Sequence, residues 1–265
     1  MYATPQIYFT SAPSITSSNS SNTYSVYAAT SGNVNWTAYG GVQINGSGSY
    51  CCGQSATIST QNYGGLIEVT ASNSCGTSPV VSSVIYTPFV QNTTINGSNG
   101  SSATVSYVAT LSLDTRGTAT GGNWVVTNGT GSISPYGTSC NAYPNNFLRV
   151  VGTPTNQYGS GQDWTFYIFK DGYSPYRMAY PNPASDQVTL EFEDAQMAEE
   201  LLTTVTLLDD KGKYWKKFDG KEAKNKDYFK HSKGITFDVK DVAKGTYFIQ
   251  IKLANNVYKE RLIIE

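Results

Sequence analysis

Residues 244–264 read KGTYFIQIKLANNVYKERLII. In an extended segment Tyr247, Ile249 and Ile251 would share one face, because successive side chains of a strand point to opposite sides. The two asparagines at 255–256 interrupt this alternation with a residue type that favours turns. The stretch therefore predicts two antiparallel strands joined by a short turn.

The same pattern extends over the last third of the chain. Apolar stretches separated by turn residues predict six strands, at residues 188–192, 204–208, 213–218, 235–239, 247–253 and 257–264. Between the second and the third, Asp209-Asp210-Lys211-Gly212 reads as a hairpin turn, since glycine can adopt a positive φ. Residues 195–202 indicate one short helix.

The first two thirds also read as short strands between turn residues. They are predicted at residues 6–10, 23–28, 33–37, 42–44, 56–59, 66–71, 80–86, 89–95, 104–113, 123–127, 147–151 and 164–170. A faint repeat links Asn35-Trp36 with Asn123-Trp124, each followed by glycine and a short strand that ends in isoleucine. A buried tryptophan on a central strand is a usual core element of immunoglobulin-like sandwiches.

These patterns predict an all-β chain of three tandem immunoglobulin-like β-sandwich domains, at residues 1–87, 88–176 and 177–265. The charge distribution supports a change of module, because only five of the 18 basic and 19 acidic side chains precede Lys170. The net charge of −1 gives no reason to expect a nucleic-acid partner. The sequence has no apolar run long enough to span a membrane. No signal peptide is visible, so we expect a mature or shortened form of a larger exported protein.

The four cysteines are Cys51, Cys52, Cys75 and Cys140. They form no Cys-x-x-Cys pair, and the single histidine, His231, lies far from them in the sequence, so we expect no zinc site. Disulfides in an oxidising compartment are the better interpretation. We favour a bond from Cys51 or Cys52 to Cys75. A direct bond between the two adjacent cysteines is the alternative, and Cys140 is either free or bridges modules.

Five features of the last third resemble, in order, the type A C-terminal sorting domain of the Bacteroidetes type IX secretion system. They are Tyr180-Pro181-Asn182-Pro183, the strand Val188-Thr189-Leu190, Asp209 and Gly212 after an apolar strand, Gly245 and Tyr247 before an apolar run, and Lys259 and Ile263 in the final strand. The Lys-rich stretch at 216–233 departs from the pattern, and we expect it to form a solvated hairpin.

This resemblance implies that the module is read by the outer-membrane translocon and shuttle proteins of the secretion system. The protein would pass through the periplasm to the cell surface or the medium, with the module cleaved off or retained. Physical chemistry accounts for the same residues without secretion, and this structural alternative stays open. Pro181 and Pro183 would hold an extended segment, and Gly212 and Gly245 would serve turns.

The first module resembles the PKD-like, immunoglobulin-fold domains that precede such sorting domains. The resemblance rests on Val34-Asn35-Trp36-Thr37, on Gly40–Ile44, and on the strand from Gly65 that ends in Asn73-Ser74-Cys75-Gly76. It implies a non-catalytic spacer or adhesion role for the first two modules.

Residues 1–169 contain only three carboxylates, Glu68, Asp114 and Asp163, and we expect Glu68 to point to solvent. A hydrolase needs an acid and a base close together. We therefore expect no catalytic residue, no metal and no cofactor.

Exposed aromatic side chains offer a second interpretation of the first two modules, because they can stack on sugar rings. Tyrosines in predicted loops stand at positions 39, 50, 63, 136, 143 and 158. The alternative function is therefore that of a carbohydrate-binding accessory region of a larger secreted enzyme, with a polysaccharide or another cell-surface ligand as partner.

Overall fold

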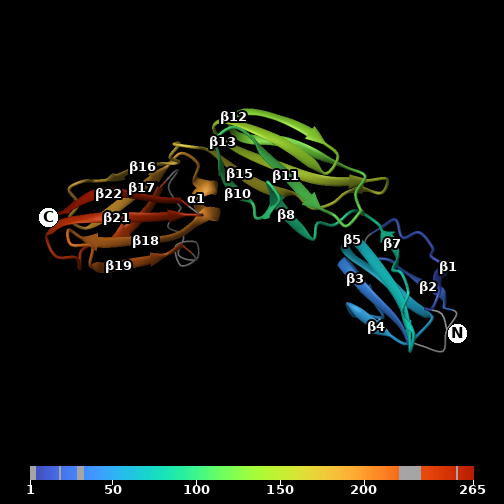
Figure 1. Ribbon diagram of the computed structural model, residues 1–265. Helices are drawn as coiled ribbons and strands as arrows, with labels where there is room; N and C mark the ends of the chain where they lie inside the picture. The colour runs from blue at the N-terminus through green and yellow to red at the C-terminus, as the bar shows by residue number, and fades with distance from the viewer. Residues whose placement is uncertain (1–3, 18, 29–32, 221–233, 255) are drawn as a thin grey trace. The chain divides into compact units, whose positions relative to one another are not determined.

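The computed structural model describes residues 4–17, 19–28, 33–220, 234–254 and 256–265 (Figure 1). Within these ranges the protein is built from strands and one short helix, which confirms the predicted all-β class. The chain divides into two compact units, Met1–Lys170 and Asp171–Glu265. The predicted domain boundaries at 87 and 176 stay a prediction. His231 and most of the Lys-rich stretch lie outside the described residues.

The first sheet of the N-terminal unit follows the order β1-β2-β5-β3-β4, with β6 and β7 also paired to β5. Its strands are β1 (Ile7–Ser11), β2 (Ser21–Ala28), β3 (Asn33–Ile44), β4 (Ser49–Cys51), β5 (Ser55–Asn73), β6 (Gly76–Thr77) and β7 (Val81–Ile85). The first half of β5 pairs with β2 and its second half with β7, while β3 runs along its other edge. The two long strands therefore carry most of this sheet's pairing.

Glycines explain why β3 and β5 are each longer than the sequence predicted. The pairing between them shifts register after Gly40, which has φ +73°. A Cβ atom on Gly41 would lie 2.4 Å from the carbonyl oxygen of Tyr63. A Cβ on Gly65 would lie 2.0 Å from the carbonyl oxygen of Tyr39. The glycines therefore let the two backbones approach at a bulge, where the sequence pattern predicted an interruption.

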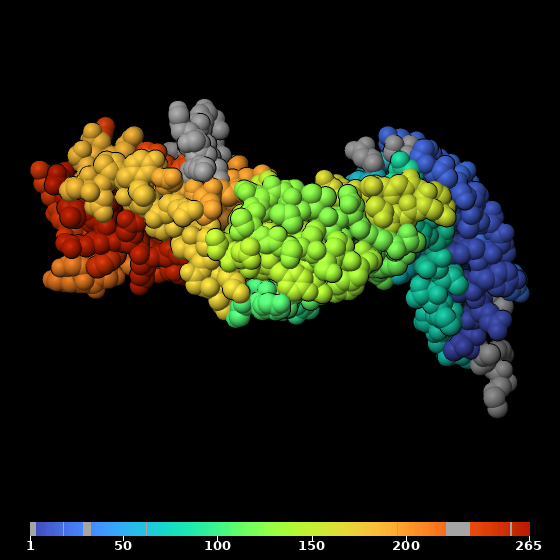
Figure 2. All heavy atoms as spheres, turned by 90° about the horizontal axis from the view of Figure 1, so that it is seen from above, coloured from blue at the N-terminus to red at the C-terminus, as the bar shows by residue number. Residues whose placement is uncertain are grey.

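The second sheet follows the order β10-β15-β13-β11-β8-β9, with β12 and β14 also paired to β13. Its strands are β8 (Asn92–Ile95), β9 (Ser98–Asn99), β10 (Ser102–Val105), β11 (Ala109–Asp114), β12 (Gly121–Tyr136), β13 (Ser139–Asn156), β14 (Gly159–Ser160) and β15 (Trp164–Lys170). The long β12–β13 hairpin, green to yellow in Figure 2, forms much of the surface of this part of the unit in that view. The sequence predicted only one short piece of each of these two strands, at residues 123–127 and 147–151.

The two tryptophans of the repeat are both buried in the cores of their sheets. Trp36 is 1% exposed and Trp124 is 6% exposed. Their indole N–H groups donate to carbonyl oxygens of glycines, at 2.8 Å to Gly53 and 3.5 Å to Gly137. The prediction of a buried tryptophan on a strand in each module is confirmed.

Hydrogen bonds of the segment between β7 and β8 join the two sheets of this unit. The side-chain amide of Asn156 donates to the carbonyl oxygens of Tyr86 (2.9 Å) and Thr118 (3.1 Å). The Thr87 hydroxyl accepts from the backbone N–H of Gly64 at 3.1 Å, and the Thr118 hydroxyl accepts from that of Phe89 at 3.3 Å. Buried backbone groups of the connection are thereby satisfied, as a fixed junction requires.

The described residues of the C-terminal unit form two sheets, with the orders β16-β17-β20 and β19-β18-β21-β22. Their strands are β16 (Tyr176–Tyr180), β17 (Gln187–Phe192), β18 (Leu202–Asp209), β19 (Tyr214–Asp219), β20 (Gly234–Asp238), β21 (Gly245–Leu253) and β22 (Asn256–Ile264). Phe218 of one sheet packs on Phe237 of the other with ring centroids 4.2 Å apart, so the core lies between the sheets. All six predicted strands are present, and β16 is an additional one.

Local sequence explains two further elements of this unit. The helix α1 (Ala195–Leu201) begins where the Asp194 carboxylate accepts the backbone N–H of Met197 at 2.8 Å, which is an N-cap. Along β21 the predicted alternation is confirmed, because Tyr247, Ile249 and Ile251 are buried. Of the turn predicted at 255–256, Asn256 is instead the first residue of β22 and pairs with Leu253, and Asn255 lies outside the described residues.

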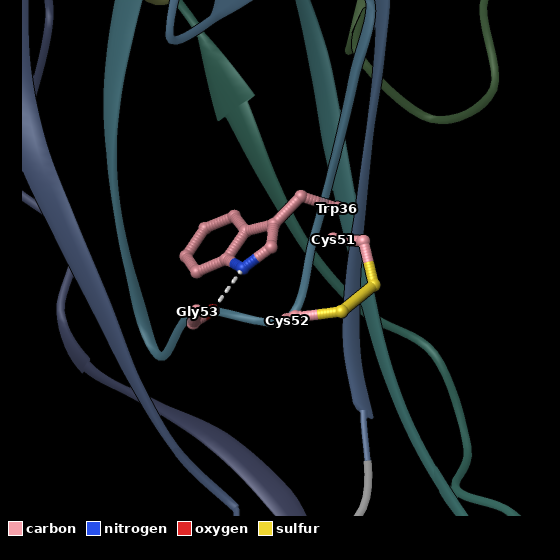
Figure 3. Close-up of a disulfide and its surroundings, with 4 residues drawn as sticks. All are labelled: Trp36, Cys51, Cys52 and Gly53. Carbon is pink, nitrogen blue, oxygen red and sulfur yellow. Dashed lines mark hydrogen bonds between the residues drawn. A yellow bond between two sulfur atoms is a disulfide. The ribbon is translucent and has the colours of Figure 1, made fainter.

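The favoured disulfide to Cys75 is wrong, because Cys51 and Cys52 are bonded to each other (Figure 3). The strand β3 separates the candidates, since β4 with Cys51 pairs along one of its edges and β5, which precedes Cys75, along the other. Two strand spacings amount to about 9–10 Å, which exceeds the Cα–Cα reach of a disulfide. Cys75 is free and exposed, and Cys140 is free and buried.

Candidate functional site

The opening motif, Tyr180–Pro183, begins with the last residue of β16. The peptide bonds Tyr180-Pro181 and Asn182-Pro183 are both cis, and residues 181–183 form bends. The predicted extended segment is therefore wrong, because the two prolines shape a bent connection between β16 and β17. All four residues of the motif are exposed, and the Tyr180 side chain keeps 44% of its surface accessible.

Asn182 joins this motif to the closing strand, β22. Its side-chain N–H group donates to the carbonyl oxygen of Arg261 at 2.8 Å, and its side-chain oxygen accepts the backbone N–H of Ile263 at 3.0 Å. Because a primary amide carries both a donor and an acceptor, it can pair with a strand edge as a backbone peptide group does. The two backbone groups that it satisfies lie on the sheet edge that β22 forms.

Backbone hydrogen bonds continue this pairing beyond the motif. The N–H of Ala184 donates to the carbonyl oxygen of Ile263 at 2.8 Å, and the N–H of Glu265 donates to the carbonyl oxygen of Ala184 at 2.9 Å. Ala184 and Ile264 form an isolated parallel bridge. The segment after β16 therefore covers the end of the outer edge of β22, which blunts an otherwise open sheet edge.

Glu260 is a second link between β16 and β22, which the sequence motif did not predict. Its carboxylate accepts the hydroxyl of Tyr176 and, at 3.0 Å, the backbone N–H of Ala179. The pKa of the Tyr176 phenol is raised well above its ordinary value. Burial is the largest cause, and the hydrogen bond to the Glu260 carboxylate is the next. The signal in the sequence is a glutamate two residues before the inward-facing Leu262, at a strand position where alternation predicts an apolar side chain.

The Asp209–Gly212 stretch forms the predicted hairpin turn between β18 and β19. One carboxylate oxygen of Asp209 accepts the backbone N–H groups of Lys211 (3.0 Å) and Lys213 (2.7 Å). Gly212 has φ +77° and donates its N–H to the carbonyl oxygen of Asp209 at 3.0 Å. A glycine is favoured here because side chains disfavour that backbone conformation.

Gly245 and Tyr247 both lie in the strand β21 and not in a turn. Gly245 is the first residue of β21, and a Cβ atom there would meet only the Tyr247 ring, at 3.5 Å. The predicted turn role of Gly245 is therefore wrong. Tyr247 is 4% exposed, and its hydroxyl donates to the carbonyl oxygen of Ala243 at 2.8 Å, while its ring meets Trp215 edge-on. The buried Tyr247 side chain therefore holds the segment that leads into β21 at Ala243.

Residues 178–265 match the family model of the secretion system C-terminal sorting domain. This segment is a sorting domain of the type IX secretion system. The match begins within β16 and ends at the last residue of the chain, so it includes both the opening motif and the closing strand. The protein therefore carries an export signal, and the sorting domain implies interaction with the secretion machinery.

A search of curated protein sequences found no match. Three solved structures similar to the chain are extracellular domains 3–5 of Drosophila OTK, dimeric latent PorU from Porphyromonas gingivalis, and the Escherichia coli adhesin FdeC. Their sequence identities are 10%, 11% and 12%, and their TM-scores are 0.30, 0.25 and 0.26. The alignments cover 93%, 98% and 98% of this chain and 92%, 34% and 96% of those structures. We draw no functional conclusion from such distant similarity.

The residues of the sorting motif fall into two groups. Asp209, Gly212 and Tyr247 shape a turn and a buried contact, so their roles lie in the fold. The opening motif and Lys259 are exposed. Lys259 lies on the same outward face of β22 as Ile263, which is partly exposed. We call the opening motif, Lys259 and Ile263 the exposed group of the sorting domain.

Outside the sorting domain, Glu68 does not point to solvent as predicted. Its carboxylate pairs with the guanidinium of Arg116 at 2.6 Å and accepts the hydroxyl of Tyr39 at 3.1 Å. The Arg116 guanidinium also lies 4.2 Å from the centroid of the Tyr39 ring. This cluster links the two sheets of the N-terminal unit.

The other two carboxylates of the N-terminal unit are held separately. Asp114 accepts the backbone N–H of Arg116 at 3.1 Å, and Asp163 accepts the hydroxyl of Thr153 at 2.6 Å. Across the described ranges, no three histidine, cysteine or acidic side chains cluster as a metal site would require. No helix in the described part of the chain has the length and apolar character to cross a membrane.

The tyrosines that the sequence placed in loops lie mostly on strands. Tyr39 is in β3, Tyr50 in β4, Tyr63 in β5, Tyr136 in β12 and Tyr143 in β13, whereas Tyr158 is in the turn after β13. Long bulged strands take up the glycine-rich stretches that the sequence analysis read as loops. The loop assignment is therefore wrong for all but the last of these residues.

Proposed function

We propose that the sorting domain is recognised as a folded module by the translocon and shuttle proteins of the type IX secretion system. The observation that carries this proposal is the pairing of Asn182 with β22. The side-chain amide of Asn182 bonds to residues 79 and 81 positions later in the chain. The pieces of the motif therefore come together only after the domain has folded, and an unfolded tail would not present them side by side.

The proposed recognition surface is the exposed group of the sorting domain, which consists of the opening motif, Lys259 and Ile263. These residues lie at the end of β16, on the bends after it and on the outward face of β22. A partner that contacts both places would recognise the motif sequence and would bind only when the domain is folded. The core of the domain, including Tyr247, would act only by holding this surface in shape.

A lysine substitution separates recognition from folding. In the full chain, carrying a signal peptide and produced in a type IX-competent bacterium, Lys259→Ala should lower the exported fraction at least fivefold. Its thermal unfolding should stay within the scatter of the unchanged protein, because surface substitutions of this kind usually change stability by less than about 0.5 kcal/mol. The matched control is Lys240→Ala, which removes another exposed lysine from a loop outside the proposed surface.

Export is measured as the ratio of protein in the medium and on the surface to protein in the periplasm. Equal export of the two lysine variants would contradict the proposed surface. A parallel loss of export and of folded protein in Lys259→Ala would assign that residue to the fold and also contradict it.

For the N-terminal unit we propose a non-catalytic spacer or adhesion role at the cell surface. The support is the separation of its carboxylates into a salt bridge with Arg116, a local turn and a hydroxyl contact. A general acid and a general base need to face the same reacting group. Turnover of a polysaccharide that Asp163→Asn abolishes would contradict this role.

A further inference from the structure

A pocket of about 350 Å³ lies within the N-terminal unit, beside the connection between its two sheets. The residues that line this junction pocket include Tyr39, Tyr63, Phe89, Gln91, Gln162 and Trp164. Ligand sites in proteins span roughly 300–1,000 Å³ and commonly occur where two modules meet. The volume therefore suits a small ligand or one end of a longer one.

Two aromatic side chains of the junction pocket are available to a ligand. Tyr39 is already engaged, because its ring stacks with Phe89 and lies under the Arg116 guanidinium. Tyr63 and Trp164 are half-buried, and neither has a ring contact of this kind within the described residues. Aromatic side chains with a polar end suit ligands that have both an apolar face and polar groups.

Hydrogen-bonding groups at the pocket are also free. In the part of the chain that the structure describes, the side-chain amides of Gln91 and Gln162 make no hydrogen bond, and both residues are exposed. The same holds for the Tyr63 hydroxyl and the Trp164 indole N–H. An amide offers donors and an acceptor together, and a hydroxyl does the same. Such a mixed set matches ligand hydroxyl groups, which also donate and accept.

Among the described residues, no charged residue lines the junction pocket. Glu68 and Arg116, which both contact the pocket residue Tyr39, pair with each other at 2.6 Å. A charged ligand would lose water in this pocket without gaining a counter-charge, which is unfavourable. The lining therefore favours a neutral ligand.

The junction pocket is held in shape by the packing around it. A Cβ atom on Gly40 would lie 2.8 Å from the carbonyl oxygen of Gly64 and 2.9 Å from the Phe89 side chain, so only a glycine admits Phe89 at this distance. Hydrogen bonds from Asn156 and to Thr87 fix the connection beside the pocket. A site that is ordered before binding loses less entropy when the ligand arrives.

We infer that the junction pocket binds a sugar ring of a neutral glycan, through stacking on Tyr63 or Trp164 and hydrogen bonds to Gln91 and Gln162. The apolar C–H face of a pyranose meets an aromatic ring, and its hydroxyl groups meet the two amides. This binding site belongs to the N-terminal unit and is independent of the sorting domain. It gives the exported protein a contact with a polysaccharide.

The test is titration calorimetry of the full chain with neutral oligosaccharides. The probes are the five-sugar oligomers of β-1,4-glucose, α-1,4-glucose, β-1,4-xylose and β-1,4-mannose. We expect at least one of them to bind. The double substitution Gln91→Ala/Gln162→Ala should weaken that binding at least tenfold, because both amides lose their hydrogen bonds while the exposed positions leave the fold intact. Tyr63→Ala is a further variant, which removes one of the two rings.

The matched control is Gln6→Ala/Gln61→Ala, which removes two exposed glutamine side chains that do not line the junction pocket. Its binding should equal that of the unchanged protein. Absence of binding by all four probes at millimolar concentration would overturn the inference. Binding that the Gln91→Ala/Gln162→Ala change leaves unaltered, or that the control variant weakens equally, would also overturn it.

Discussion

At the scale of residues, single side chains make hydrogen bonds that link β16 and the segment after it to β22. Asn182 supplies one donor and one acceptor to β22, and Glu260 accepts a hydroxyl and a backbone N–H from β16. The sequence predicted Asn182 as part of a motif but not as a partner of the closing strand. Its partners lie about 80 residues away in the chain, and local patterns hold no information on such pairing.

Two glycines of the sorting motif should respond differently to substitution. Gly212→Ala should destabilise the C-terminal unit by roughly 1–2 kcal/mol, because Gly212 has φ +77° and side chains disfavour that region. Gly245→Ala should be neutral, or stabilise by about 0.5 kcal/mol, because Gly245 lies in a strand with ordinary space for a Cβ atom. Urea unfolding of residues 171–265 measures both. Equal losses would contradict the structural distinction.

The free cysteines should differ in reactivity. Cys75 is exposed and should react with a maleimide at neutral pH, whereas buried Cys140 should react only after denaturation. Burial raises the pKa of the Cys140 thiol from 9.0 to about 11. The folded state therefore favours the protonated thiol, and stability should fall as pH rises from 9 through 11. Mass spectrometry of labelled protein counts the thiols, and two labels on the native protein would contradict the assignment.

At the scale of elements, the two units differ in how far the sequence predicts them. In the sorting domain, apolar alternation and polar turns place the six strands and the helix within a few residues of their positions. In the N-terminal unit, glycines that form bulges, such as Gly40 and Gly129, look like strand breakers in the sequence. The long β12–β13 hairpin was therefore predicted as two short fragments.

The link between β16 and β22 should contribute to stability as a pair. Glu260→Gln and Tyr176→Phe should each destabilise residues 171–265 by about 1–2 kcal/mol, because each removes a partly buried hydrogen bond between the Tyr176 hydroxyl and a charged carboxylate. The double variant should lose clearly less than the sum, since the two side chains share one interaction. Glu191→Gln on β17 is the matched control. Additive losses in denaturant unfolding would contradict the link.

At the scale of the whole molecule, the chain combines a C-terminal sorting domain with an N-terminal unit that we propose is its cargo. The motif residues of the sorting domain could be predicted from the sequence. Which of them form the exposed group and which shape the fold could not be predicted from it. That division depends on which strand covers which edge. The junction pocket was likewise beyond sequence reasoning, because it arises where Tyr63 of β5 and Trp164 of β15 come near the same connection.

The most direct test is the export of a fluorescent protein fused to residues 171–265, with a signal peptide, in a type IX-competent bacterium. This segment is a compact unit of its own, so the fusion should fold. We predict that fluorescence reaches the cell surface or the medium, that a strain lacking the type IX translocon keeps it in the periplasm, and that a fusion to residues 1–170 stays in the periplasm in both strains. Retention of the 171–265 fusion in the competent strain would contradict the central claim that this folded unit is the export address.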